Sequence, residues 1–154
     1  ISTLARVHTF GKSLGCHGAV VLGSTTLIKY LINFSRPFIY TTAIAPNSVS
    51  TILQSYQHMQ TSQATNQLRE NINLFVAHIN HENWLLSDSS IQSILIPGNQ
   101  NTKKAANELQ ERGFDVRPIL HPTVEKGKER LRVCLHSFNK KEDIILLCQL
   151  LNQI

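Results

Sequence analysis

Two short β-type runs near the start of the chain enclose a turn rich in glycine, serine and threonine. A single lysine, Lys12, lies in this turn between Gly11 and Ser13, and Thr9 stands three residues before it. Glycines let a bulky aromatic aldehyde approach the backbone, and neighbouring hydroxyls can bind its phosphate. Partial removal from bulk water turns a lysine amine into a usable nucleophile. The turn therefore suits a lysine that forms a Schiff base, and a surface lysine between two strands is the simpler alternative.

The pair Gly11-Lys12, followed by Ser13, also suggests a phosphate-binding P-loop. That motif requires a glycine five positions before the second glycine, and Arg6 occupies this position. No helical pattern follows Ser13. The sequence therefore excludes the P-loop.

Composition narrows the class of protein further. The 154 residues are enough for one ordinary domain, 42% of them are hydrophobic, and no apolar run approaches the ~20 residues of a membrane span. Without a charged-then-apolar leader pattern, we expect a cytoplasmic protein. The net charge of +5 comes with only 6% aromatic residues, so nucleic-acid binding is not expected. A polyanionic small molecule would suit this mild positive excess.

Cysteines and histidines offer no metal or disulfide pattern. The three cysteines are widely spaced and we expect free thiols. His78 and His81 are one helical turn apart, but no cysteine or acidic ligand recurs at matching spacing. We therefore expect no metal site.

Apolar periodicity divides the chain into two parts, residues 1–60 and residues 61–154. In the first part it predicts strands over 4–10 and 18–23, a helix from Ser24 or Thr25 to about Phe34, a β-like segment over 38–42, and a long helix from Pro46. This helix should continue towards Ile79 with a break within the polar stretch 60–67.

The second part changes to an α+β pattern. Strands are predicted over 91–96, 114–119 and 130–135, with a helix capped by Asn101 or Thr102 and closed by Gly113, and a final helix over 140–151 capped by Asn139. Such a unit folds as a small sheet of three to four strands with helices on one face. Alternation along a strand also places Arg130 and Arg132 on the same face.

Several motifs resemble one family in order and spacing. They are the segments TFGK (9–12), GAVVL (18–22), SRPFIYTT (35–42), HPTV (121–124) and GKERLRV (127–133). Together they resemble the α-oxoamine synthases, pyridoxal-phosphate (PLP) enzymes of the α/β aspartate-aminotransferase architecture (fold type I). These enzymes condense an amino acid with an acyl-CoA and release CO2. The resemblance implies that this chain is the C-terminal part of such an enzyme, beginning just before the PLP lysine.

The resemblance also implies roles for individual residues. Lys12 would bind PLP covalently and act in catalysis, and Thr9 would bind the PLP phosphate. Arg132 would bind the amino-acid carboxylate through a bidentate fork, and Thr123 would lie near the substrate channel. A further segment, which in the family reaches the neighbouring active site of a homodimer, would contribute Tyr40 to substrate binding and Thr41 and Thr42 to the phosphate.

The motifs indicate the cofactor more specifically than the substrates. Tyr40 followed by two threonines is more similar to family members that join alanine to a pimeloyl thioester in biotin synthesis. Members with other substrates share the Lys, Thr and Arg motifs, and a non-catalytic domain that retained the fold is an alternative of another class. The family's pyridinium-binding Asp lies upstream of the lysine, whereas the first acidic residue here is Glu70. We therefore expect an incomplete cofactor site, no bound PLP and no activity in this chain alone.

Overall fold

The computed structural model describes residues 3–154, and these form two compact units. The first unit ends at Ser62, and the second spans Gln63–Ile154.

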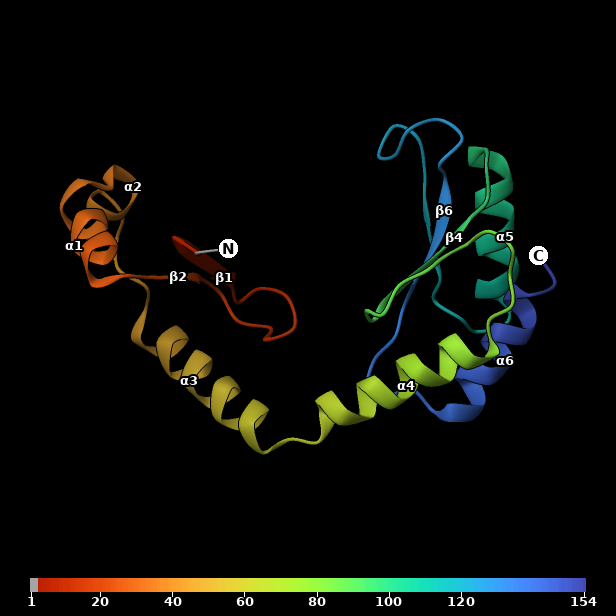
Figure 1. Cartoon of the computed structure of the whole chain (residues 1–154), viewed down its shortest axis with the longest axis horizontal. Helices are drawn as coiled ribbons and strands as arrows, with labels where there is room; N and C mark the ends of the chain where they lie inside the picture. Colours follow the sequence, from red (N-terminus) through yellow and green to blue (C-terminus); the bar gives the residue numbers. More distant parts are fainter. Residues whose placement is uncertain (1–2) are drawn as a thin grey trace. The chain divides into compact units, whose positions relative to one another are not determined.

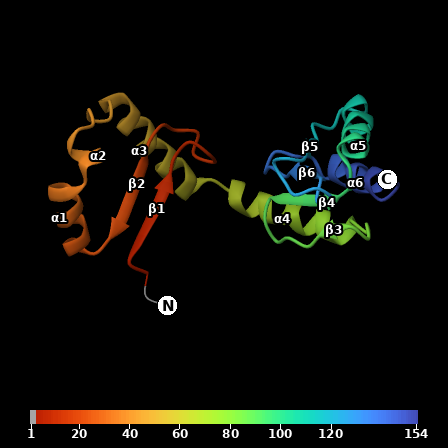
Figure 2. The ribbon, with the colours of Figure 1, turned by 90° about the horizontal axis from the view of Figure 1, so that it is seen from above.

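The first unit begins with a β-hairpin (Figure 2). Strands β1 (Ala5–Thr9) and β2 (Ala19–Gly23) pair antiparallel, with Ala5 opposite Gly23 and Thr9 opposite Ala19. Helix α1 (Thr25–Phe34) follows, and the Ser24 hydroxyl accepts the Leu27 N–H at 3.2 Å. The predicted hairpin strands, and the helix capped at Ser24, are confirmed.

The β-like segment predicted over residues 38–42 is wrong. A short helix α2 (Arg36–Ile39) occupies this position, and Tyr40 ends it by donating its backbone N–H to the Arg36 carbonyl. Pro37 lies in the first turn of α2, where a proline loses no helical hydrogen bond and its fixed φ suits the helix. This local preference outweighs the β propensity of the isoleucine, tyrosine and threonines.

The long helical pattern is interrupted as expected. Helix α3 (Pro46–Thr61) ends where the Ser62 N–H donates to the His58 carbonyl, and helix α4 (Ala64–His78) begins in the second unit. The polar stretch 60–67 therefore contains a break, as predicted.

The second unit contains a four-stranded antiparallel sheet (Figure 1). Its strands run in the order β3 (Trp84–Leu85), β4 (Ile91–Leu95), β6 (Arg130–Cys134) and β5 (Arg117–Ile119). The predicted small sheet is confirmed, with two differences. Strand β3 was not expected, and β5 is shorter than the predicted 114–119, because the N–H groups of Phe114 and Val116 donate to the Leu109 and Phe114 carbonyls and not to a neighbouring strand.

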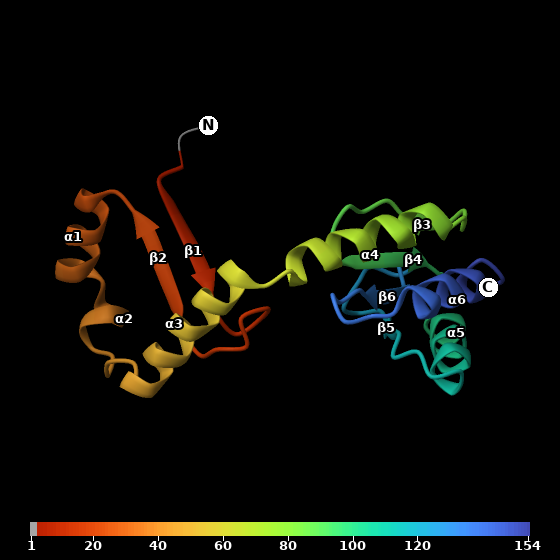
Figure 3. The same cartoon turned by 90° about the horizontal axis from the view of Figure 1, so that it is seen from below.

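Three helices cover one face of this sheet: α4, α5 (Asn99–Glu111) and α6 (Lys141–Leu151). Helices α4 and α6 lie side by side (Figure 3). Along β6, Leu131 and Val133 are buried, whereas Arg132 and Cys134 are exposed on the opposite face. The buried side joins a single core that includes Phe75, Ile94, Ala106, Leu109, Leu131, Val133, Leu147, Cys148 and Leu151. We call the opposite side of the sheet, on which Arg132 and Cys134 are exposed, its open face.

Both predicted helix caps in this unit are wrong. Helix α5 begins at Asn99 because Gly98, at a φ of +94°, turns the chain directly into the helix. Thr102 lies in the first turn, fully buried, and its hydroxyl donates to the Ile96 carbonyl at 2.7 Å. Before α6, Asn139 accepts the His136 N–H instead of capping the helix. Gly113 closes α5 as predicted.

Candidate functional site

Lys12 is the first residue of a tight turn within the loop that joins β1 to β2. The Gly15 N–H donates to the Lys12 carbonyl at 2.9 Å, and Gly15 has a φ of +62°. The Phe10 N–H donates to the Gly18 carbonyl at 2.9 Å and extends the hairpin ladder towards the turn. The Lys12 side chain is exposed. The hairpin therefore presents the amine at its tip.

Two apolar side chains hold the base of this turn against α3. Phe10 and Cys16 are each 6% exposed. The Phe10 ring meets Tyr56 edge-on with centroids 6.1 Å apart, and the Cys16 thiol lies 3.2 Å from the Ser55 hydroxyl. Sequence reasoning missed these anchors, although two apolar residues at the ends of a polar turn were the available signal.

Gly18 allows the hairpin to lie close to Ile44, which precedes α3. It has a φ of +116°, and a Cβ at this position would lie 2.9 Å from Cδ1 of Ile44. At this φ any larger residue would be strained. The Lys12 turn is therefore held in position by its flanking residues.

The residues of this turn match the chemical groups of PLP. A primary amine suits an aldehyde, and the threonine and serine hydroxyls of the same turn suit a phosphate. In the part of the chain that the structure describes, no carboxylate forms an ion pair with Lys12. Thr9 ends β1 three residues before the lysine and is also exposed. Lys12 and Thr9 are thus brought together in one hairpin.

Tyr40, Thr41 and Thr42 lie at and after the end of α2. All three are exposed, and the Thr41 hydroxyl donates to the Pro37 carbonyl. Among residues 3–154, no hydrogen bond joins these three residues to the Lys12 turn. Their assignment to a phosphate and a substrate therefore stays a prediction.

Arg132 lies at the centre of the open face of the second sheet. It is opposite Ser93 of β4 on one side and opposite Arg117 of β5 on the other. Arg130 is on the same face, as the strand alternation predicted, and its Nε donates to the Lys128 carbonyl at 3.0 Å. The two arginines therefore differ, because Arg130 is tethered to the preceding loop.

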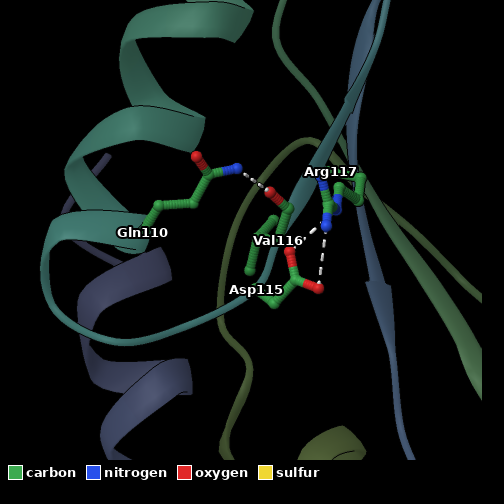
Figure 4. A network of polar contacts seen from close by, with 4 residues as sticks. All are labelled: Gln110, Asp115, Val116 and Arg117. Carbon is green, nitrogen blue, oxygen red and sulfur yellow. Dashed lines mark hydrogen bonds and ion pairs between the residues drawn. The ribbon is translucent and has the colours of Figure 1, made fainter.

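Arg117 has an acidic partner. Its Nε lies 2.7 Å from Oδ1 of Asp115, and Nη2 donates to Oδ2 at 3.1 Å (Figure 4). Such a two-point fork is the preferred geometry of a guanidinium and a carboxylate. Sequence reasoning did not single out this pair, because only the strand register places Arg117 beside Arg132.

Thr123 lies in the loop between β5 and β6, and α5 supports this loop. The Asn99 side chain donates to the His121 carbonyl at 3.1 Å and accepts the His121 N–H at 2.9 Å. Thr123 itself is exposed. No hydrogen bond joins it to Arg132 among the residues that the structure covers.

Glu129 supports the same loop from its other end. The side chain is 2% exposed, and Oε2 accepts the N–H groups of Gly98 at 3.0 Å and Gly127 at 2.9 Å. These bonds, above all the one from Gly98, favour the ionised carboxylate and lower the pKa of Glu129 despite its burial. Nothing in the sequence separated this acid from the exposed charges around it.

The described residues contain neither a metal-ligand cluster nor an apolar helix of membrane-spanning length. Within 3–154, no group of three or more His, Cys, Asp or Glu side chains could hold a metal ion. Over the same residues, none of the helices has the length and apolarity that a membrane crossing requires.

Similarity to known proteins identifies the class to which this chain belongs. The chain belongs to the class I and II aminotransferase family, whose model matches residues 2–149. Its sequence is 36% identical over 149 residues to an 8-amino-7-oxononanoate synthase of Emericella nidulans, covering 90% of this chain and 36% of the relative. It is 39% identical over 150 residues to the enzyme of that name from Pseudomonas savastanoi pv. phaseolicola, covering 96% and 38%. The chain thus spans less than two-fifths of the length of these relatives.

Solved structures agree with this family. The 8-amino-7-oxononanoate synthase of Francisella tularensis superposes with a TM-score of 0.80 at 28% identity, covering 97% of this chain and 45% of that one. A serine palmitoyltransferase of Sphingomonas wittichii has the same fold, with a TM-score of 0.76, 18% identity, and coverage of 97% and 39%. The resemblance to the α-oxoamine synthases and the expected fold are confirmed.

Proposed function

We propose that the whole protein is a PLP-dependent α-oxoamine synthase that joins L-alanine to a pimeloyl thioester. The amino-acid Cα attacks the thioester carbonyl, the thiol leaves, and the alanine carboxyl group is lost as CO2, which gives 8-amino-7-oxononanoate. The observation that carries this proposal is the similarity to two enzymes of that name over at least 90% of the chain. Lys12 and Arg132 are both present in the required motifs.

Residues of both units would have roles in binding the cofactor and the amino acid. When bound, PLP supplies an electron sink for the negative charge that develops at the amino-acid Cα. The Lys12 amine would hold the cofactor aldehyde carbon and, once released by the substrate, accept the Cα proton as a general base. The Thr9 hydroxyl would donate to the phosphate. Arg132 would orient the amino acid by a two-point contact with its carboxylate.

We further propose that the enzyme is a homodimer. The likeness of residues 35–42 to a family segment that reaches the neighbouring active site supports this. Tyr40, Thr41 and Thr42 would then serve the neighbouring active site. The acidic partner of the pyridinium nitrogen would come from the remainder of the protein, so residues 1–154 alone would be inactive.

Other substrates define the second candidate function. The structural likeness to a serine palmitoyltransferase is compatible with a different amino acid and acyl chain. A 2-amino-3-ketobutyrate CoA ligase or a 5-aminolevulinate synthase would use the same lysine and arginine. A non-catalytic domain that kept the fold is disfavoured, because it would have no need to retain Lys12 and Arg132 together.

An assay of the full-length protein with its cofactor tests these alternatives. Alanine, glycine and serine are each combined with pimeloyl, acetyl, succinyl and palmitoyl thioesters, and the products are identified by mass spectrometry. We expect 8-amino-7-oxononanoate from alanine and the pimeloyl thioester, with CO2 released in equal amount. Faster turnover of any other pair would replace the proposed substrates, and no turnover of any pair would favour the non-catalytic domain.

A further inference from the structure

Two arginines of the open face are direct neighbours. Arg117 of β5 and Arg132 of β6 are opposite each other in the antiparallel register, and both are exposed. Side chains in such a position have Cβ atoms about 5 Å apart. Both side chains therefore start from neighbouring positions on the open face, and like charges directly opposite each other are unfavourable unless an anion neutralises one of them.

Asp115 neutralises only one of these arginines. It forms the two-point fork with Arg117, whereas no carboxylate lies within ion-pair distance of Arg132 among residues 3–154. Among these residues, a carboxylate balances the charge of Arg117, whereas the charge of Arg132 has no acidic partner.

The backbone fixes the Asp115–Arg117 pair in place. Val116 lies between the two residues, is 2% exposed, and packs into the core. Its carbonyl accepts a hydrogen bond from the Gln110 side chain of α5 at 2.8 Å (Figure 4). Arg117 belongs to the open face through its register with Arg132, and the ion pair places the exposed Asp115 beside it.

We propose that Asp115 determines amino-acid specificity by holding Arg117, which leaves Arg132 as the single guanidinium for a substrate carboxylate. This inference rests on the proposed function, in which Arg132 binds the amino acid. A substrate with one carboxylate finds one free partner. A dicarboxylic amino acid finds no free partner for its second carboxylate and meets the negative charge of Asp115, so the site selects against it.

Calorimetric titration of the full-length protein, loaded with its cofactor, tests the proposal. L-alanine and L-aspartate are the probes, and the measured quantity is the ratio of their dissociation constants. In Asp115→Asn, Arg117 is released and L-aspartate should gain about two- to fivefold relative to L-alanine, within the range expected for exposed charge pairs. The double variant Asp115→Asn with Arg117→Leu should lose most of this gain. Glu108→Gln is the matched control, because Glu108 pairs with Lys104 on the exposed side of α5.

Three results would overturn the proposal. These are an unchanged ratio in Asp115→Asn, an equal change in Glu108→Gln, or a gain that persists in full without Arg117. Circular dichroism and thermal midpoints establish that each variant is folded, and Arg117→Leu alone, which should retain the discrimination, gives a second test. A protein that binds L-alanine but forms no product with a pimeloyl thioester would refute the proposed function and leave this inference standing.

Discussion

The carboxylate of Glu129 accepts the backbone N–H of Gly98 at 3.0 Å, although the two residues are 31 positions apart in the sequence. Gly98 is the N-cap residue immediately before α5, and Glu129 immediately precedes β6. This single contact therefore joins the start of a helix to the loop that carries Thr123. The additional bond from Gly127 closes the loop onto itself.

The stability contributed by Glu129 should depend on pH. Its pKa in the folded protein is lowered from an ordinary value of 4.5, mainly by the Gly98 N–H. A lowered pKa stabilises the fold above the unfolded value, and the contribution is lost as pH falls from about 4.5 through the folded value. We expect Glu129→Gln to lower the thermal midpoint at pH 7, and the difference from wild type to shrink below pH 4.5.

Thermal unfolding followed by circular dichroism from pH 3 to pH 8 measures this effect. Glu111→Gln, which removes an exposed acid from the end of α5, serves as the control and should change the midpoint little at any pH. A difference between wild type and Glu129→Gln that stays constant from pH 8 to pH 3 would contradict the assigned role of the charge.

Arg132 and Arg130 should respond differently to the same substitution. Arg132→Lys replaces a planar fork with a point charge, and loss of a charged hydrogen bond costs about 2 kcal/mol, or roughly a 30-fold rise in the Michaelis constant for the amino acid. Binding of PLP should change much less. Arg130→Lys is the matched control on the same face of β6. Equal effects of the two substitutions, measured by steady-state kinetics of the full-length protein, would remove Arg132 from the substrate site.

Local sequence signals predicted most of the regular elements. Ser24 ahead of an apolar helical pattern located the start of α1, and the alternation around Leu131 and Val133 gave both the strand and its buried face. The failures have physical causes. Strand β3 has two residues, too few for a pattern, and Pro37 favours a helical turn in a segment of strong β propensity.

The candidate site was predictable only where it depends on motifs. Lys12 and Arg132 were predicted as site residues from motifs that lie close to them in the sequence. The neighbourhood of Arg132 could not be found in this way, because the pairing of β5 with β6 brings Arg117 beside it. Glu129 was missed for a similar reason, since its burial depends on the distant Gly98.

The thiols of Cys134 and Cys148 should differ sharply in reactivity. Cys134 is exposed on the open face of the sheet, whereas Cys148 is fully buried and its thiol faces the Phe75 carbonyl at 3.7 Å. Burial raises the pKa of Cys148 to about 12, so its reactive thiolate is suppressed at pH 8. With an aromatic disulfide reagent at pH 8, we expect Cys134 to react first and Cys148 only after denaturation. Cys134→Ser should remove the fast phase, and a fast phase assigned to Cys148 by peptide mapping would contradict the buried core.

Lys12 should be the residue that holds the cofactor in the full-length protein. The hairpin presents its amine at an exposed tip, and Phe10 and Cys16 fix the turn against α3. We expect the purified protein to be yellow, Lys12→Ala to lose the visible absorption band, and borohydride reduction followed by peptide mapping to label Lys12. Lys29→Ala, which changes an exposed lysine of α1, is the control and should keep the band. Labelling of another lysine would show that the β1–β2 turn is not the cofactor site.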